Sequence, residues 1–399
     1  MNIKYNKLNH EILSRLYQFR VLSYSEINNY IFKSKNLKES YCDKILKTVL
    51  LKNGFAKKSG YYKSEATYQI TQKGINYLKK TGIIKLDGLS LEDDPLMLTA
   101  SELRMKENIV KHQTSLAHFI LEWSSTDRFD YYDEKYVSKI LNGVKPDGLV
   151  ITDDIYYFVE MDMNTERKTS LLKKWNSYRT FLKSGSRYDI KHKICVLFVI
   201  GGGNTNKSKR RDYIMRDMVD NLFDYISEDF NVLVGTEEEL LKRIHRDNRS
   251  VIKNAFENYG FKIYKGTSKD GSFAGYSFDY FCPMIKYGKE VELGYVLQEF
   301  LVDDMTDGNL YSMLKIRNAA SIQSMYSHKM NRYIKIILVV ETEERVLELY
   351  KLVDNINDLI YFTTPSRLTA LPLNFALFQT DGNKKWHFSQ ESLRVRVFE

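Results

Sequence analysis

The second part of the chain repeats part of the first. Within the 399 residues, the segment Asp162-Met163-Asn164-Thr165 has a counterpart 142 residues later, Asp304-Met305-Thr306-Asp307. Six of the fifteen positions 162–176 are identical in the counterpart, without a gap. The same offset pairs 109–111 with 251–253 and 194–199 with 336–341. One register held over this distance indicates an internal duplication, so we predict two copies of one unit, at residues 103–241 and 245–399.

The first copy shows what that unit contains. Its hydrophobic periodicity alternates between helix and strand spacing. We expect a helix near 105–122, strands near 128–132, 147–151 and 155–161, a helix near 166–183, a strand near 193–200, a helix near 209–227 and a strand near 231–235. This order occurs in metal-dependent nucleases of the PD-(D/E)xK type. The predicted fold class is therefore α/β, with two tandem nuclease-like units behind an N-terminal domain.

The positive charge of the chain is concentrated at that N-terminal end. The net charge is +9 overall. Residues 1–85 hold 17 Lys and Arg against five Asp and Glu, a balance of +12, which leaves −3 for residues 86–399. A basic end on an otherwise slightly acidic chain indicates a polyanionic partner for residues 1–85.

The same 85 residues have the pattern of a winged helix. Helical spacing covers His10–Tyr17, Ser23 and Glu26 form a predicted capping box for a second helix, and a third helix runs from about 37 to 52 before Gly54. Short strands with a turn at 59–60 or 63–66 then precede a closing helix from residue 73. In a winged helix, the third helix enters the major groove and the hairpin contacts phosphates. A short acidic connector, residues 86–102, follows this domain.

We therefore expect residues 1–85 to bind double-stranded DNA through the third helix and the hairpin. The candidate contacts are Lys38, Ser40, Tyr41, Lys44 and Lys47 on the helix, and Lys57, Lys58, Tyr61, Tyr62 and Lys63 on the hairpin.

The first α/β copy carries candidate catalytic residues. Phosphodiester cleavage by a nuclease of this order needs carboxylates that bind Mg²⁺ or Mn²⁺, together with a lysine near the attacking water. Asp147 and Glu160 have the required spacing and are the candidate metal ligands. Asp162 stands where the nuclease pattern has lysine, and Lys173 on the following helix is the candidate replacement.

A structural interpretation of these residues is also open. Asp162 and Lys173 could form an ion pair that holds the helix to the sheet, and the second copy keeps both residues as Asp304 and Lys315. In the ungapped register, the second copy has Lys289 opposite Asp147 and Val302 opposite Glu160. We therefore predict that the second copy is degenerate and lacks the metal site.

Other classes of protein are disfavoured by composition. The three cysteines are far apart and predict neither a disulfide framework nor a zinc site. No apolar run approaches the roughly 18 residues that span a bilayer, so we expect a cytoplasmic protein without a membrane partner.

These motifs resemble the plasmid replication-relaxation proteins. The resemblance rests on the basic winged helix, on His112 and Leu116 in the next helix, and on the segments Lys-Pro-Asp-Gly and Phe-Val-Glu-Met-Asp-Met-Asn-Thr-Glu at 145–148 and 158–166. Proteins of this family have a Pro-Asp strand and a Glu-x-Asp-x-x-Thr-Glu strand end. Here the pattern is matched by Pro146, Asp147, Glu160, Asp162, Thr165 and Glu166, and the resemblance covers about residues 8–200. It implies a protein of a plasmid or mobile element that binds an origin and assists replication or DNA relaxation.

Three functions follow from this sequence. The first is sequence-specific DNA binding at a plasmid origin, in replication initiation or relaxation, without catalysis. The second is a metal-dependent endonuclease or nickase that uses Asp147 and Glu160, and the third is a transcriptional regulator of plasmid genes. Repeated origin sites would favour a homodimer, although no heptad pattern specifies one.

Overall fold

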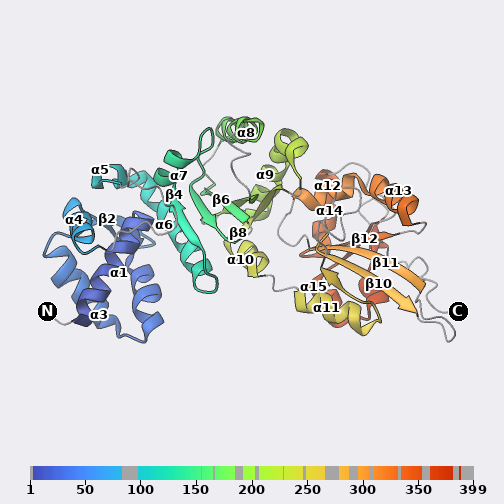
Figure 1. Cartoon of the computed structure of the whole chain (residues 1–399), viewed down its shortest axis with the longest axis horizontal. Coiled ribbons are helices and arrows are strands. Elements are labelled where there is room, and N and C mark those ends of the chain that lie inside the picture. The colour runs from blue at the N-terminus through green and yellow to red at the C-terminus, as the bar shows by residue number, and fades with distance from the viewer. Residues whose placement is uncertain are drawn as a thin grey trace. The chain divides into compact units, whose positions relative to one another are not determined.

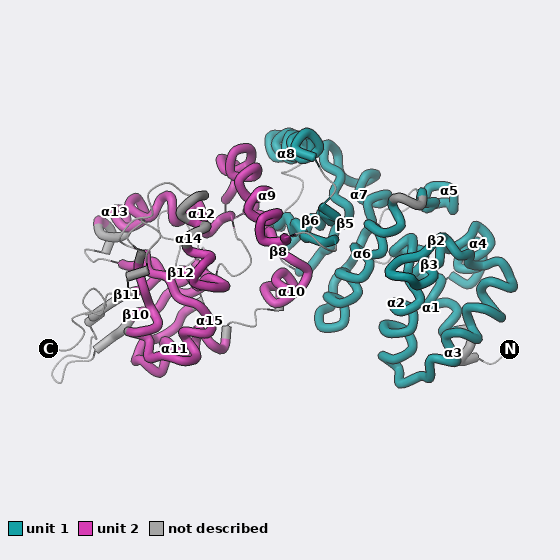
Figure 2. The backbone as a smooth tube through the Cα atoms, turned by 180° about the vertical axis from the view of Figure 1, so that it is seen from behind, with its two compact units in different colours: residues 1–203 teal, residues 204–399 magenta. Residues whose placement is uncertain are grey.

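The computed structural model describes most of the chain. The described residues are 3–82, 98–153, 155–164, 167–184, 192–202, 206–227, 229–245, 249–265, 278–286, 295–304, 310–330, 334–352, 360–380 and 386–387. Most of the predicted connector, together with Thr165, Glu166 and Lys289, lies outside these ranges. The chain forms two compact units, Met1–Gly203 and Asn204–Glu399 (Figure 2). The predicted boundary between the repeats, at residues 241–245, falls inside the second unit.

Unit 1 begins with a helical region that contains one hairpin and closes with a helix (Figure 1). Its elements are α1 (Ile3–Phe19), β1 (Leu22–Ser23), α2 (Tyr24–Ile27), η1 (Asn28–Phe32), η2 (Lys33–Lys35), α3 (Glu39–Lys44), η3 (Ile45–Leu51), β2 (Ala56–Tyr62), β3 (Glu65–Ile70) and α4 (Gln72–Lys80). The predicted capping box is confirmed, because the Ser23 side chain accepts from the Glu26 N–H and the Glu26 carboxylate accepts from the Ser23 N–H. The predicted third helix is α3 continued by η3, and the chain leaves it through Gly54 at φ +67°.

The hairpin turns at Lys63 and Ser64. Both residues have positive φ, 48° and 67°, as a two-residue turn between twisted strands requires. The alternative turn at Ser59-Gly60 is an irregularity inside β2, where the pairing with β3 shifts register between Lys58 and Gly60.

The rest of unit 1 is an α/β region with a mixed sheet. It contains α5 (Ala100–Leu103), α6 (Glu107–Ser124), β4 (Asp130–Asp133), α7 (Glu134–Ile140), β5 (Gly148–Ile151), β6 (Ile155–Asp162), α8 (Lys168–Lys183) and β7 (Lys193–Ile200). Within unit 1 the strand order is β4-β5-β6-β7, with antiparallel pairs up to β6 and a parallel β6–β7 pair. The predicted α/β class is confirmed. Helix α7 was not predicted.

The helical region packs against the α/β region within unit 1. The rings of Phe19 and Tyr131 stack with centroids 5.0 Å apart, and the Tyr62 hydroxyl lies 3.0 Å from the Ser115 hydroxyl on α6. Arg20 is buried between the two regions and pairs with Asp133, with 3.3 Å between Arg20 Nε and Asp133 Oδ2. Apolar and charged contacts together therefore join the two regions.

Unit 2 contains a second mixed sheet. Its elements are α9 (Lys207–Leu222), η5 (Phe223–Tyr225), β8 (Phe230–Thr236), α10 (Glu237–His245), α11 (Arg249–Asn258), β9 (Tyr264–Lys265), β10 (Tyr280–Lys286), β11 (Tyr295–Asp304), α12 (Leu310–Arg317), α13 (Ala319–Met330), β12 (Lys335–Val339), α14 (Glu343–Leu352), β13 (Ile360–Thr363), α15 (Pro365–Ala370), α16 (Leu373–Ala376), β14 (Gln379–Thr380) and β15 (Trp386–His387). Strands β9 to β13 are neighbours in sequence order, antiparallel up to β11 and parallel from β11 to β13. The four strands β4 to β7 and the four strands β9 to β12 thus have the same neighbours and the same relative orientations, antiparallel, antiparallel and parallel, as expected for two copies of one unit.

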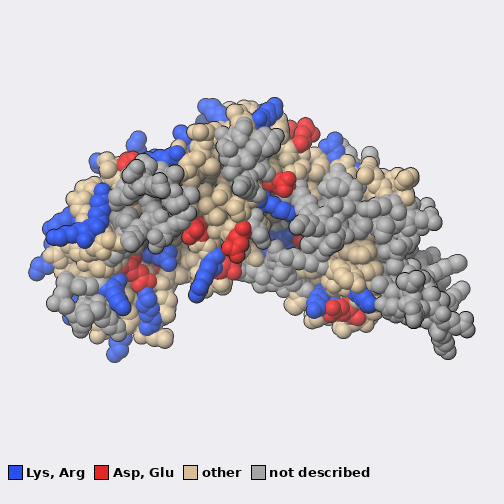
Figure 3. Space-filling view, in the orientation of Figure 1, with Lys and Arg blue, Asp and Glu red and all other residues tan. Residues whose placement is uncertain are grey.

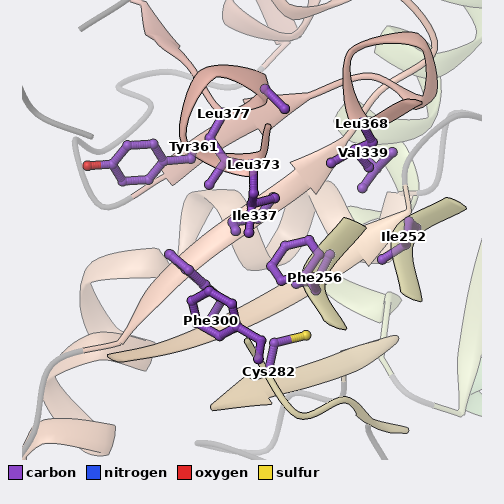
Figure 4. Packing of buried hydrophobic residues seen from close by; sticks show 13 residues of the cluster. Ile252, Phe256, Cys282, Phe300, Ile337, Val339, Tyr361, Leu368, Leu373 and Leu377 are labelled. Atoms are coloured by element: carbon purple, nitrogen blue, oxygen red, sulfur yellow. The ribbon is translucent and has the colours of Figure 1, made fainter. Parts of the chain in front are cut away.

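The core of unit 2 lies between this sheet and its helices. Ile252 and Phe256 of α11 meet Phe300, Ile337 and other buried strand residues, with Leu368 and Leu373 from the C-terminal helices (Figure 4). Among the described residues, none of the helices is both long enough and apolar enough to cross a membrane.

Candidate functional site

Asp147 and Glu160 lie on neighbouring strands at the same level of the unit 1 sheet. Gly148 pairs with Val159 in the antiparallel β5–β6 ladder, so the next step places Asp147 opposite Glu160. Asp147 Oδ2 accepts the Met161 N–H at 2.8 Å, which fixes the carboxylate against β6. The glycine beside Asp147 is required by close packing, because a Cβ at Gly148 would lie 2.9 Å from the Tyr131 ring.

His112 of α6 is the partner of Asp147. Its Nε2 lies 2.9 Å from the Met161 carbonyl oxygen and 3.3 Å from Asp147 Oδ2. Since a carbonyl oxygen can only accept, Nε2 must carry the proton. Burial of the ring lowers the pKa of His112, but the hydrogen bond and the charge of Asp147 outweigh burial, so the pKa is raised.

Lys174 of α8 is the partner of Glu160. Its Nζ lies 2.8 Å from Glu160 Oε2, and the Tyr178 hydroxyl donates to Glu160 Oε1 at 2.7 Å. Burial raises the pKa of Glu160 to about 7 despite the charge of Lys174, and the nearby Asp147 adds to the rise. Burial would also raise the pKa of Asp147, but His112 and then Lys174 hold it below its ordinary value. The two carboxyl groups therefore differ strongly in acidity, as acid and base groups in functional sites do.

The structure places the other two candidates differently. Lys173 is exposed on α8, and its neighbour Lys174 reaches the acid instead. The buried side of α8 is marked by Leu171, Trp175 and Tyr178. Because successive residues of a helix are about 100° apart, Lys174 lies next to that side and Lys173 lies away from it. Helical spacing could therefore have identified Lys174. Asp162 is fully buried at the end of β6, where its side chain accepts the Asn164 N–H at 2.9 Å.

The arrangement of these side chains does not fit a bound Mg²⁺ or Mn²⁺. Each acid already has a close side-chain partner, the Lys174 ammonium for Glu160 and the His112 ring for Asp147. Over the part of the chain that the structure describes, no three His, Cys, Asp or Glu side chains are grouped as metal ligands. Since a divalent ion of this kind needs several oxygen ligands, we derive no metal-dependent step from Asp147 and Glu160.

Unit 2 contains the same arrangement with other residues. Tyr280 pairs with Val302, which places Asp279 opposite Asp303. Asp279 Oδ2 accepts the Asp304 N–H at 2.9 Å, as Asp147 does for Met161. The buried Asp303 pairs with Lys315 of α12, and burial raises the pKa of Asp303. Both units thus hold a half-buried acid just before one strand, a buried acid on the next strand and a lysine from the following helix, which we call the acid–lysine cluster.

This finding differs from the ungapped comparison of the two copies. The ungapped register set Lys289 and Val302 against Asp147 and Glu160, whereas the corresponding sheet positions hold Asp279 and Asp303. The reason is a longer hairpin in unit 2, where β10 and β11 have 7 and 10 residues against 4 and 8 in β5 and β6. The acids are therefore retained in the second copy at a shifted position.

The candidate DNA contacts occupy the outward face of the N-terminal region. Exposed side chains are Lys38, Ser40, Tyr41, Lys44 and Lys47 around α3 and η3, and Lys57, Lys58, Tyr61 and Lys63 on the hairpin. Tyr62 differs, because its hydroxyl contacts Ser115 and its ring lies under the Lys63 ammonium, 5.2 Å from the ring centroid. Tyr62 therefore links the hairpin to α6 and is not one of the solvent-exposed candidates.

The His112–Asp147 pair predicts a titration effect. In Asp147→Asn, burial should act on the imidazole without the opposing charge, so the pKa of His112 should fall below its value in the wild type. An NMR titration of the His112 ring, assigned with His112→Gln, measures this shift. Asp153→Asn, at an exposed acid on the β5–β6 turn, is the control and should leave the titration unchanged. An unchanged His112 pKa in Asp147→Asn would disprove the pairing.

Comparison with known proteins identifies a family for the first part of the chain. No curated protein and no solved structure gives a significant match to the chain. A family model described as Replication-relaxation matches residues 13–197. The matched residues run from α1 into β7 and include the outward N-terminal face, Asp147, Glu160 and Lys174. The resemblance predicted from the sequence is confirmed, because residues 13–197 of this chain match the replication-relaxation family model.

Proposed function

We propose that the protein binds double-stranded DNA at the origin of a plasmid or mobile element and acts there in replication or relaxation, with the N-terminal region as a sequence-specific winged helix. The observation that carries the proposal is the outward face of α3, η3 and the β2–β3 hairpin. Its cations Lys38, Lys44, Lys57, Lys58 and Lys63 are all exposed. The family description, which names replication and relaxation, supports the same function.

The two parts of this face would have different tasks. A helix such as α3 with η3 has the diameter that the major groove accepts, and Ser40, Tyr41 and Lys44 would contact base edges there. Lysines of the hairpin would neutralise phosphates, which contributes affinity without sequence information. The contact of Tyr62 with Ser115 would hold the hairpin at a fixed angle to α6.

Binding to DNA from the protein's own locus tests the proposal. Fluorescence anisotropy should show preferred binding of one origin segment over unrelated duplex of equal length. Lys57→Ala/Lys58→Ala should weaken both and reduce the slope of log affinity against log salt by about 2, whereas Ser40→Ala/Lys44→Ala should mainly reduce the preference. Lys79→Ala/Lys80→Ala removes equal charge from the exposed end of α4 and is the matched control. Equal effects of all three variants would contradict the proposal.

The same DNA distinguishes the alternatives. With supercoiled plasmid and Mn²⁺, we expect a retarded but uncut band, because the carboxylates of the unit 1 acid–lysine cluster are already paired. Conversion to open circle that disappears in Asp147→Ala would instead identify a nickase. A footprint over a promoter rather than the origin would favour a transcriptional regulator. A homodimer stays a prediction, and sedimentation of the complex would test it.

A further inference from the structure

The exposed face of α8 is rich in cations and contains no acid. Residues 167–183 include Arg167, Lys168, Lys173, Lys174, Arg179 and Lys183, and no Asp or Glu. The buried side of the helix consists of Leu171, Trp175, Tyr178 and Phe181. Figure 3 shows Lys and Arg atoms over the part of unit 1 where Figure 1 labels α8. Surface helices usually mix charges of both signs, so a helix with one sign needs an explanation.

The other exposed side chains of α8 are also suited to an anion. Thr169, Ser170, Asn176, Ser177 and Thr180 are exposed between the cations. Hydroxyl and amide groups, together with Lys and Arg, are the side chains that donate hydrogen bonds to DNA phosphates. With 16 residues the helix is about 24 Å long. It can therefore present donors to several phosphates of one duplex.

The corresponding helix of unit 2 provides an internal comparison. Helix α12 follows β11 as α8 follows β6, and its Lys315 has the role of Lys174 in the acid–lysine cluster. However, Leu310, Tyr311, Met313 and Ile316 of α12 are buried, and its only exposed cation is Arg317. The cationic face of α8 is thus not needed by the shared fold, since the second copy forms the same cluster without it.

We infer that the α8 face, formed by Arg167, Lys168, Lys173 and Lys183, is a second DNA-contact surface that binds the phosphate backbone of duplex DNA. This inference rests on the proposed function and extends it to the α/β region. The N-terminal region would select the site, while α8 would add affinity that does not depend on sequence.

Charge neutralisation on α8 tests the inference. The variant Lys168→Gln/Lys173→Gln/Lys183→Gln keeps Lys174, so the acid–lysine cluster stays intact. With full-length protein and a 30-base-pair duplex, the slope of log affinity against log salt should fall by about 2 to 3. Affinity should drop about tenfold or more for origin and unrelated duplex alike, at unchanged melting temperature. The matched control is Lys242→Gln/Lys253→Gln/Lys262→Gln, three exposed lysines of unit 2, which should leave the slope unchanged.

The outcomes separate this inference from the proposed function. Equal changes in both triple variants would show that only net charge matters, and an unchanged slope in the α8 variant would show that α8 does not contact DNA. Either result overturns the inference even if origin binding is confirmed. Conversely, a lowered slope in the α8 variant, without any preference of the wild type for origin DNA, would support the α8 surface and contradict the proposed site selection.

Discussion

Lys174→Met should lower the free energy of unfolding of unit 1 by about 1–2 kcal/mol at pH 8, because Glu160, whose pKa is about 7 beside this cation, must take up a proton when the cation is removed. Glu160 is 1% exposed, whereas Lys174 is 19% exposed, so water can replace only part of the lost interaction. Denaturant titrations followed by tryptophan fluorescence measure the change. Trp123 and Trp175 are both fully buried in unit 1 and report its unfolding.

Two comparisons establish the cause of this loss. Lys173→Met changes the adjacent exposed lysine and should shift stability by less than about 0.5 kcal/mol. The Lys174→Met penalty should also shrink below pH 6. Glu160 has a raised pKa of about 7, so below that value the buried side chain is protonated and needs no cation. As the pH rises through about 7 the side chain ionises, and the stability that the protonated form contributes is lost. Equal penalties for the two lysines would contradict the assignment of Lys174 to the acid–lysine cluster.

The sequence predicted secondary structure well where local physical rules decide it. The capping box at Ser23 and Glu26 depends on four consecutive residues. Gly54, in the left-handed conformation, follows the end of the third predicted helix. The strand at 193–200 is a continuous apolar run after its first residue, Lys193, and it was predicted with the bounds of β7. Helix α7 was missed because its start depends on Asp133, which caps it while also pairing with Arg20 from a distant segment.

The candidate site was predicted less completely because it depends on spatial neighbours. Asp147 and Glu160 were found from strand spacing, but His112 comes from α6 and reaches them only through the packing of that helix on the sheet. In unit 2, an ungapped comparison could not find Asp279 and Asp303, since the hairpin between them is longer. Pairing register across strands, which sequence comparison does not contain, identified both acids.

Arg20→Met should lower the free energy of unfolding of unit 1 by about 3–5 kcal/mol, the usual range when one partner of a buried ion pair is removed. Arg20 and Asp133 are 3% and 4% exposed and join the helical region to the α/β region. Arg20 has φ +68°, and Met carries the same backbone strain, so the substitution isolates the loss of the charge. Hydrogen exchange of α1 and α7, together with denaturant titration, measures how far the two regions separate.

The pH dependence and a second partner make this prediction specific. Burial raises the pKa of Asp133 to about 6 although Arg20 opposes the rise. Without Arg20 the pKa of Asp133 should rise further, so the penalty should be larger at pH 8, where Asp133 of the wild type is ionised, than at pH 5.

Glu134 is the other partner of Arg20, and it is 39% exposed. Glu134→Gln should therefore lower the free energy of unfolding by less than about 1 kcal/mol. The double variant Arg20→Met/Asp133→Asn removes both charges and keeps a cap for α7, so it should be more stable than Arg20→Met alone. A penalty that is independent of pH and persists in the double variant would mean that packing of the arginine stem, rather than its charge, joins the two regions.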